Sequence, residues 1–296
     1  MNNISVIGAG TMGNGIAHVF ALRGYNVNLV DQSEVALATA IAGITQNLDR
    51  QIVKGAIAES EKFEALRCLS TYTDIVEAVA SADLVVEATT EDLSTKLDIF
   101  RQLDQSTPAS CILASNTSSI SLTKIASVTQ RIDKVIGMHF MNPVPLMLLV
   151  EVIRGYATSD HTTHIIMELS RQLGKVPVEV NDYPGFVANR ILMPMINESI
   201  YSLYEGVAGV SEIDTVMKLG MAHPMGPLQL ADFIGLDVCL SILNVMFDGF
   251  GNPKYAPCPL LVNMVQAGDL GRKSGRGFYQ YEKGSNDFLV ALRFRD

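Results

Sequence analysis

The sequence predicts an α/β fold, in which a doubly wound, mostly parallel sheet is followed by an all-α C-terminal domain. Three observations predict it. Apolar runs of strand length alternate with longer helical patterns from Ile4 to about Val180, the first run ends in a glycine-rich turn, and helical patterns alone follow Pro184. Apolar runs separated by helices are typical of parallel strands that are buried on both faces. A chain of 296 residues is long enough for two domains, which we place at 1–183 and 184–296.

Seven apolar runs are expected to form the strands of the first domain, because each has strand length and is bounded by polar or glycine-containing segments. In chain order they are "ISVIGAG", "NVNLVDQ", "ADLVVEAT", "SCILASN", "KVIGMHF", "LLVEVI" and "VPVEV". The segment between Asp31 and Leu84 is too long for a plain connection and carries helical periodicity in "VALATAIAGITQNLDRQIVKG" and "ESEKFEALRCL". We predict that it forms an inserted pair of helices that projects from the sheet.

The second domain is expected to begin after "NDYPGF", where the strand patterns stop. Its first helix is predicted in "FVANRILMPMINESIYSLYEGV". Pro194 lies inside this pattern and should remove one backbone hydrogen bond and bend the helix. Glycine and proline punctuate the shorter helical patterns that follow, and no strand is predicted among them.

The composition excludes several classes of partner. A net charge of −9 leaves no basic surplus to neutralise phosphates, so no nucleic acid is expected as the main partner. No apolar run approaches the roughly 18 residues of a membrane-spanning helix, and the first strand begins at Ile4, so we expect no membrane segment and no targeting peptide. Charged residues make up only 18% of the chain, against a usual value of about 25%, which favours a buried subunit interface.

The cysteines and histidines predict no metal site. The four cysteines show no C-x-x-C pair, and the two histidines of "HTTH", His161 and His164, have no cysteine near them in the chain. A polar start of a helix is the simpler account of "HTTH". Cysteine usage of this kind favours a reduced compartment, and we expect a cytoplasmic protein.

The glycine-rich turn "VIGAGTMGNG" predicts a dinucleotide site of the Rossmann type. Gly8, Gly10 and Gly13 have the G-x-G-x-x-G spacing, directly after a strand and at the start of a helix, with Thr11 and Met12 between the last two glycines. The first glycine permits a tight turn, the second lets the backbone approach a pyrophosphate, and the third lets helix and strand pack closely. The free N–H groups of the helix N-terminus favour the phosphates.

Asp31, at the end of the next strand, predicts that the cofactor is NAD(H). A carboxylate about twenty residues after the glycines can accept hydrogen bonds from both ribose hydroxyls, and it repels the 2′-phosphate of NADP(H). S-adenosylmethionine and FAD are the alternative ligands of such a turn.

The stretch "HFMNPVPLMLLVEV", 139–152, places Glu151 inside an apolar strand. A buried and unpaired carboxylate would cost several kcal/mol, so a partner is expected, and His139 lies twelve residues earlier, across a turn marked by two prolines. A histidine also suits the base that alcohol oxidation needs, because its ordinary pKa lies near neutrality. The alternative is a glutamate at a sheet edge with its carboxylate in solvent and a histidine that bonds to backbone.

Seven blocks of the sequence resemble the L-3-hydroxyacyl-CoA dehydrogenase family, and within it the stand-alone bacterial 3-hydroxybutyryl-CoA dehydrogenases. They are "VIGAGTMGNGIA", "VVEATTEDLSTK", "ASNTSSI", "GMHFMNPVPLMLLVEVI", "DYPGFVANRIL", "HPMGPLQLADFIGLDV" and "GRKSGRGFY". They span nearly the whole chain and occur in the family's order, which is far more specific than the glycine turn alone.

The resemblance implies roles for particular residues. His139 matches the catalytic base, Glu151 the carboxylate that orients it, Ser118 the serine that contacts the substrate oxygen, and Asn189 the asparagine that completes the site from the helical domain. The residues that match cofactor contacts, besides the glycine turn and Asp31, are Glu91, Lys96, Ser118, Asn142 and Lys273. Lys54, in the inserted helical pair, matches a lysine that meets the CoA phosphates, whereas Asn47 stands where some relatives have a serine that contacts CoA.

The resemblance thus implies reversible NAD-dependent oxidation of a short-chain (S)-3-hydroxyacyl-CoA, in a homodimer built through the helical domain. Two alternatives stay open within the superfamily: a gulonate-type dehydrogenase of a free hydroxy acid, and a non-catalytic structural relative of the crystallin kind. A dehydrogenase of the 3-hydroxyisobutyrate or 6-phosphogluconate type would need a lysine in the helix after Gly185, where "FVANRILMPMINES" has none.

Overall fold

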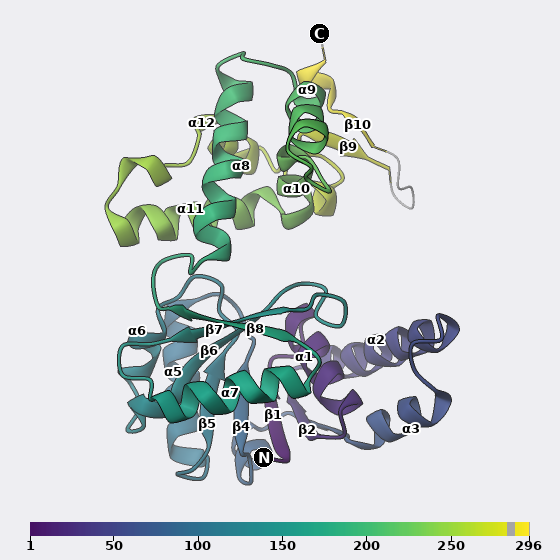
Figure 1. Cartoon of the computed structure of the whole chain (residues 1–296), viewed down its shortest axis with the longest axis vertical. Coiled ribbons are helices and arrows are strands. Elements are labelled where there is room, and N and C mark those ends of the chain that lie inside the picture. The colour runs from purple at the N-terminus through teal and green to yellow at the C-terminus, as the bar shows by residue number, and fades with distance from the viewer. Residues whose placement is uncertain (283–287, 296) are drawn as a thin grey trace. The chain divides into compact units, whose positions relative to one another are not determined.

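The computed structural model describes residues 1–282 and 288–295, and it divides the chain into two compact units, Met1–Tyr183 and Pro184–Asp296 (Figure 1).

The first unit is built on an eight-stranded sheet with the strand order β3-β2-β1-β4-β5-β6-β7-β8. Strands β1 to β6 run parallel to their neighbours, β7 runs antiparallel to β6, and β8 is parallel to β7. The chain reverses direction at β7 because a short turn, rather than a helical crossover, joins β6 to β7. The strands are β1 (Asn3–Ile7), β2 (Asn26–Val30), β3 (Leu69–Tyr72), β4 (Leu84–Glu87), β5 (Ile112–Ser115), β6 (Val135–Phe140), β7 (Leu149–Arg154) and β8 (Val176–Asn181).

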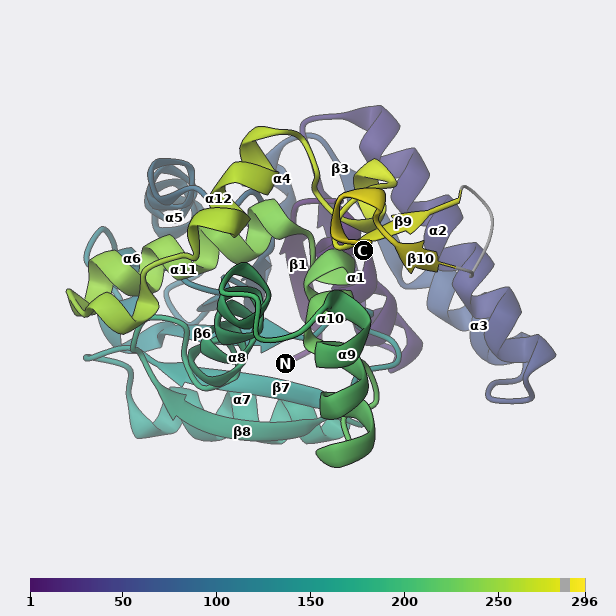
Figure 2. The ribbon, with the colours of Figure 1, turned by 90° about the horizontal axis from the view of Figure 1, so that it is seen from above.

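Helices cover both faces of this sheet, as a doubly wound fold requires. Three of them, α1 (Thr11–Leu22), α2 (Glu34–Val53) and α7 (Asp160–Gln172), share one apolar core with one face of the strands. Figure 2 shows α7 running along β7 and β8. The other face meets α4 (Ile75–Val79), α5 (Leu93–Ser106) and α6 (Leu122–Ala126), which contact one another in series. The central strands are therefore buried on both sides, which explains their unbroken apolar runs.

The inserted segment contains more than a pair of helices. The expected helices are α2 and α3 (Glu59–Arg67), but the edge strand β3 and the short helix α4 follow them. Strand β3 was not predicted, since "LSTY" is short and half polar. An edge strand exposes one side to solvent, so it needs no continuous apolar run.

The second unit is helical, with one addition to the predicted all-α domain. Strands β9 (Tyr279–Tyr281) and β10 (Phe288–Val290) form a two-stranded antiparallel sheet that the sequence pattern did not predict. Its helices are α8 (Ala188–Tyr204), which continues through Pro194, α9 (Val210–Thr215), α10 (Pro227–Ile234), α11 (Leu236–Phe250) and α12 (Pro259–Gln266). Short helical turns complete the two units: η1 (Ile132–Lys134), the π-helical turn η2 (Val216–Gly220), η3 (Pro253–Tyr255), η4 (Arg272–Ser274) and η5 (Leu292–Phe294).

A buried pair of aspartates ties the second unit together. Asp232 of α10 accepts hydrogen bonds from the backbone N–H groups of Phe278 and Tyr279 and from the hydroxyl of Tyr281. Asp214 of α9 accepts a hydrogen bond from the hydroxyl of Tyr279 at 2.7 Å. These bonds fasten β9 to two helices that precede it by many residues, so the hairpin is part of the core of this unit.

Among the described residues, no single helix combines the length and the hydropathy of a membrane span. Helices α10 and α11 meet those criteria only when they are taken together, and they are bent by 96° at the break between them.

Candidate active site and cofactor-binding turn

The glycine turn between β1 and α1 leaves space where a dinucleotide phosphate would need it. Gly8 has a φ of +103°, and a Cβ there would lie 2.6 Å from the carbonyl oxygen of Ala88. A Cβ on Gly13 would lie 1.7 Å from the carbonyl oxygen of Gly8, so only glycine lets the helix pack this closely on the turn. A Cβ on Gly10 would meet nothing within 4 Å, so this side of the turn is open. The three positions therefore have the three properties that a pyrophosphate-binding turn requires.

The N-terminus of α1 and the carboxylate of Asp31 complete the fit to a dinucleotide. No side chain caps the first turn of α1, which begins at Thr11, so its N–H groups are available to an anion. Asp31 accepts one hydrogen bond from the N–H of Ala9 at 2.9 Å and one from the N–H of Ser33 at 3.0 Å. A carboxylate has about four acceptor positions, so Asp31 can fix the turn and still receive ribose hydroxyls.

His139 and Glu151 face each other across the antiparallel pair β6 and β7, where they are direct cross-strand partners. The Nδ1 atom of His139 lies 2.9 Å from Oε2 of Glu151, and the two side chains are 7% and 3% exposed. The expected imidazole–carboxylate contact is therefore present, and the carboxylate in the apolar strand has a partner. Because an ionised carboxylate can only accept, Nδ1 carries the proton and Nε2 of the neutral ring is left as an acceptor.

Ser118 meets the other side of the same imidazole. Its Oγ lies 3.0 Å from Nε2 of His139. The loop that carries it follows β5, and the side chain of Asn116 in this loop accepts a hydrogen bond from the N–H of Phe140 at 2.8 Å. Ser118, His139 and Glu151 thus form one continuous chain of hydrogen bonds at the carboxyl ends of β5 and β6, the edge where open α/β sheets bind ligands.

Glu91 holds the Ser118 loop through one carboxylate oxygen. Its Oε1 accepts hydrogen bonds from the N–H groups of Ser118 and Ser119, at 2.8 and 3.0 Å, and from the hydroxyls of Thr117 and Ser119. Burial would raise the pKa of Glu91, but the charge of Lys96 and these hydrogen bonds outweigh it and hold the pKa below its usual value. Glu91 is therefore an ionised anchor of the loop at neutral pH.

Lys96 is buried, with only 1% of its side chain exposed. Its ammonium group donates to both oxygens of Glu87, at 2.7 and 2.9 Å, and lies 3.4 Å from Oε2 of Glu91. Glu87, the last residue of β4, is fully buried and also accepts hydrogen bonds from Thr89 and Ser115. Two carboxylates thus share one buried ammonium group beside the Ser118 loop.

Asn142 begins the turn between β6 and β7, and the peptide bond that joins it to Pro143 is cis. Lys175 holds this turn, because its ammonium donates to the carbonyl oxygens of Val144 and Met147 at 2.5 and 2.8 Å. Burial, and secondarily the charge of Arg23, lowers the pKa of Lys175. The loop that presents Asn142 is therefore fixed by a buried cation.

The remaining predicted residues lie elsewhere in the two units. Lys54 is exposed at the C-terminal end of α2. In the second unit, Asn189 lies in the first turn of α8, and Lys273 lies in η4, where its ammonium pairs with the carboxylate of Asp237 in α11. The structure brings Ser118, His139 and Glu151 together in the first unit, with Glu91 and Lys96 beside them.

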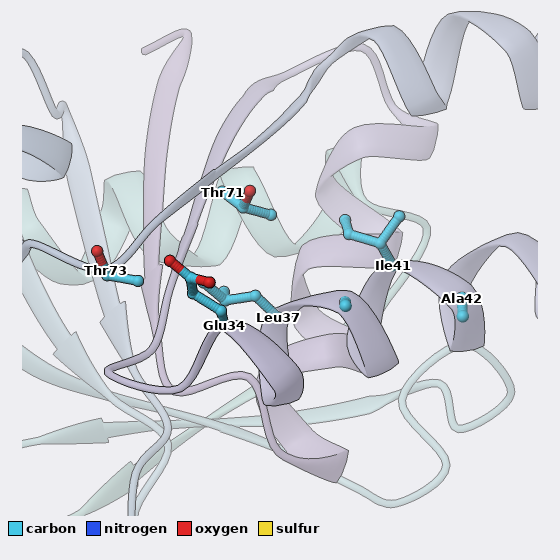
Figure 3. A pocket seen from close by; sticks show the side chains of 7 residues that line it. Glu34, Leu37, Ile41, Ala42, Thr71 and Thr73 are labelled. Carbon is cyan, nitrogen blue, oxygen red and sulfur yellow. The ribbon is translucent and has the colours of Figure 1, made fainter.

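An open pocket of about 640 Å³ lies along α2 at the edge of the sheet (Figure 3). It is lined by Glu34, Leu37, Ala38, Ile41, Ala42, Thr71 and Thr73. It borders β3, at the opposite edge of the sheet from β6 to β8, and none of the predicted catalytic residues lines it. In the part of the chain that the structure describes, no group of three or more histidine, cysteine, aspartate or glutamate side chains could hold a metal ion.

Two family models together match nearly the whole chain. The NAD-binding domain of 3-hydroxyacyl-CoA dehydrogenase matches residues 3–183, and the C-terminal domain of the same family matches residues 185–281. The chain belongs to the 3-hydroxyacyl-CoA dehydrogenase family. Its first unit therefore contains the family's NAD-binding domain, as the glycine turn and Asp31 predict.

Individual relatives agree with this membership over more than nine tenths of their length. A 3-hydroxybutyryl-CoA dehydrogenase of Bradyrhizobium diazoefficiens is 52% identical over 281 residues, which cover 95% of this chain and 96% of the relative. The human mitochondrial hydroxyacyl-coenzyme A dehydrogenase is 43% identical, with 95% and 92% covered. The crystal structure of an (S)-3-hydroxybutyryl-CoA dehydrogenase from Ralstonia eutropha superposes with a TM-score of 0.92 at 50% identity and covers 96% of this chain and 100% of that chain.

Sequence reasoning did not single out Glu87, Ser115 or Lys175, although each is buried and bonded to a loop of the site. A usable signal was present for Glu87, since an ionisable residue at the end of the apolar run "LVVE" raises the same question as Glu151. No comparable signal marks Lys175, because a lysine after a helix is ordinarily a solvent-exposed residue.

Proposed function

We propose that this protein catalyses the reversible NAD-dependent oxidation of short-chain (S)-3-hydroxyacyl-CoA, with 3-hydroxybutyryl-CoA as the representative substrate, to the 3-oxoacyl-CoA. The observation that carries the proposal is the hydrogen-bonded series Ser118–His139–Glu151 in the NAD-binding domain of a member of this family. The series supplies what alcohol oxidation requires of a protein, namely a base that is supported by a negative charge and placed beside a hydroxyl group.

His139 acts as the base through Nε2, which takes the proton of the substrate hydroxyl. Glu151 receives the Nδ1–H and stabilises the imidazolium that forms, as an ion pair in a site of low solvent exposure. Ser118 offers a hydroxyl to the substrate oxygen, and Asn189 is assigned the same oxygen from the helical domain. In the reverse direction the imidazolium returns its proton to the oxygen of the 3-oxo group.

The cofactor is held by the glycine turn, with Gly8, Gly10, Thr11, Met12 and Gly13, and by the carboxylate of Asp31. Bound NAD⁺ supplies the two-electron acceptor of the reaction. We assign Glu91, Lys96, Ser118, Asn142 and Lys273 to the cofactor site as well. The carboxylate of Asp31 disfavours a 2′-phosphate, which supports NAD over NADP.

Lys54 meets the CoA phosphates from the exposed end of α2, where a flexible ammonium group suits a phosphate partner. The helical unit, 184–296, completes the substrate site and forms a homodimer. The cysteines of the described residues are all free thiols, which fits a reducing, cytoplasmic setting.

The test follows NADH absorbance: its loss with acetoacetyl-CoA or with free acetoacetate, and, in a parallel assay with NAD⁺, its gain with free gulonate, which is already a hydroxy acid and has to be oxidised. We expect turnover with the CoA ester and, at equal concentrations, little with either free acid. Turnover of a free acid but not of acetoacetyl-CoA would refute the acyl-CoA assignment, and no turnover of any of them would refute the enzyme itself. A series of 3-oxoacyl-CoA substrates of increasing length then measures the chain-length preference.

A further inference from the structure

We propose that Glu87 and Lys96 are positioning residues, which set the catalytic loop of Ser118 through a buried series of charges. The inference rests on the proposed function, since it concerns how Ser118 is presented to His139. It starts from two unusual side chains: a carboxylate that is fully buried at the end of β4 and a lysine that is 1% exposed on α5.

The first route from Glu87 to the loop is a chain of ions. Lys96 donates to both oxygens of Glu87, and its ammonium lies 3.4 Å from Oε2 of Glu91. Glu91 then uses its other oxygen, Oε1, to receive the N–H groups of Ser118 and Ser119. One carboxylate oxygen of Glu91 thus faces the ammonium of Lys96 and the other accepts the hydrogen bonds of the loop. The position of Lys96 therefore sets the orientation of the carboxylate that holds the loop.

The second route runs through the end of β5. Oε2 of Glu87 accepts a hydrogen bond from the hydroxyl of Ser115 at 2.6 Å, and that hydroxyl oxygen accepts the N–H of Thr117 at 3.2 Å. The N–H of Asn116 donates to the backbone carbonyl of Glu87 at 2.7 Å. Both routes begin at Glu87 and end in the loop 116–119, the first at Ser118 and Ser119 and the second at Asn116 and Thr117. Hydrogen bonds therefore fix the position of the loop relative to the central strand β4.

A purely structural role does not account for this arrangement. A buried ion pair is weak evidence for stability, because removing two charges from water costs about as much as their attraction returns. An apolar or neutral pair of similar shape would often be as stable. What a neutral pair could not do is hold the ionised Glu91, and through it the loop, in one orientation.

This placement gives Lys96 a positioning task in addition to its assignment to the cofactor site. Its ammonium lies between the carboxylates of Glu87 and Glu91 and is 1% exposed. A shift of about 1 Å in a catalytic group can cost on the order of 100-fold in rate. Losing the cation therefore lowers turnover chiefly by misplacing Ser118.

The deciding variant is the double substitution Glu87→Gln with Lys96→Met. Glutamine keeps the shape of Glu87 and can still accept the hydrogen bonds of Thr89, and methionine fills the apolar length of Lys96. Both charges are removed together, so neither is left buried and unpaired, and the protein should fold even where the single variants do not. We expect a melting temperature close to that of the parent protein and a kcat for acetoacetyl-CoA reduction that falls at least about tenfold, with a smaller change in the KM and in the Kd of NADH.

A matched control is the double substitution Asp104→Asn with Arg131→Met. This pair is also mostly buried, with 9% and 12% of the side chains exposed, but it joins α5 to the segment before β6, away from the Ser118 loop. We expect this variant to keep its kcat. A stable Glu87→Gln, Lys96→Met variant with the parental kcat would overturn the proposal. A raised Kd of NADH beside that unchanged kcat would leave Lys96 with its cofactor contact alone. If the parent protein itself fails to turn over acetoacetyl-CoA, the proposed function fails instead.

Discussion

At the scale of single residues, the site depends on pairs of groups that satisfy each other where water is scarce. Glu151 lies in the middle of a strand, and its contact with His139 gives a carboxylate that would be costly alone a partner, which is the proposed base. Only the tautomer with the proton on Nδ1 satisfies the carboxylate, so the same contact fixes which ring nitrogen faces Ser118.

Replacement of the base should abolish turnover without loss of the fold. In His139→Gln the ring nitrogen that accepts the proton is absent, and loss of a general base costs about 10²- to 10⁴-fold in rate. We expect a kcat reduced by at least that lower bound and an NADH Kd, measured by fluorescence titration, close to that of the parent protein. The matched control is His164→Gln, the same change at an exposed histidine of α7, which should leave kcat unchanged. A near-normal rate in His139→Gln would mean that another group accepts the proton.

Much of this residue-level chemistry could be predicted from the sequence, and the part that could not has a physical reason. His139 and Glu151 were found because an ionisable group inside an apolar run demands a partner. Glu87 gave the same signal at a strand end but has its partner, Lys96, in a helix, where a lysine is ordinarily solvated. Spacing along the chain does not reveal that α5 turns this side chain inward onto β4.

At the scale of secondary-structure elements, the turn between β1 and α1 combines two functions in neighbouring glycines. Gly13 lets helix α1 pack closely on the turn, because an added Cβ would collide with the backbone of Gly8. Gly10 leaves room for the cofactor, because an added Cβ would meet no protein atom within 4 Å. The two roles can be separated by the same substitution at the two positions.

Gly13→Ala should destabilise the first unit, and Gly10→Ala should weaken only cofactor binding. Alanine is favoured over glycine inside a helix by about 1 kcal/mol, so a lower melting temperature in Gly13→Ala would come from the collision and not from helix propensity. For Gly10→Ala we expect a nearly parental melting temperature and an NADH Kd raised about tenfold or more, which corresponds to about 1.4 kcal/mol. Calorimetry and fluorescence titration measure the two quantities. Parental stability in Gly13→Ala would show that the turn can relax.

Asp232, which holds the hairpin of the second unit, should make the stability of that unit depend on pH. Burial raises the pKa of Asp232 to about 7 from an ordinary value of 3.8, and its hydrogen bonds oppose the shift without cancelling it. A carboxyl group with a higher pKa in the folded protein binds its proton more tightly there than in the unfolded chain. Its contribution to folding stability is therefore fully present below about pH 4 and declines as the pH rises toward 7.

Asp232→Asn removes this titration. We expect the melting temperature of the parent protein to fall between pH 5 and pH 7 more steeply than that of the variant, whose amide does not ionise. The comparison uses the two slopes rather than the absolute values, because an asparagine NH₂ group cannot accept the backbone N–H groups that Asp232 receives. Equal slopes would mean that Asp232 keeps one protonation state over this range.

The elements themselves were predictable where burial imposed a clear pattern. Unbroken apolar runs predicted the strands of the sheet interior, whereas no such run marked β3, β9 or β10. Strand β3 is an edge with exposed residues, and β9 owes its place to the two buried aspartates of preceding helices. Interactions between segments far apart in the chain leave no local period in the sequence.

At the scale of the whole molecule, the apolar surface of the helical unit is the feature that bears on assembly. Several large apolar side chains of this unit are exposed in the single chain, among them Ile191, Val207, Val216, Leu219 and Met221. Leu219, in the π-helical turn η2, is 82% exposed. A low content of charged residues points in the same direction.

We expect the protein to have a solution mass of about twice its chain mass of 32.1 kDa, measured by light scattering after size-exclusion chromatography. Leu219→Glu should shift the mass toward that of one chain, because a charge would be buried in the interface. Val76→Glu, at an exposed apolar residue of α4 in the first unit, should leave the mass unchanged. A dimer that survives Leu219→Glu would place the interface elsewhere on the helical unit.

The antiparallel pairing of β6 with β7 has a consequence for how this site tolerates change. Four cross-strand pairs, from Gly137 opposite Ile153 to Phe140 opposite Val150, fix the register of the hairpin. The distance between imidazole and carboxylate is thus set by the ladder and not by the length of the loop that joins the strands. Because Lys175 holds this loop through backbone carbonyls, side chains of the loop after Asn142 can change and alter what it contacts, while the proposed proton-transfer pair behind it stays assembled.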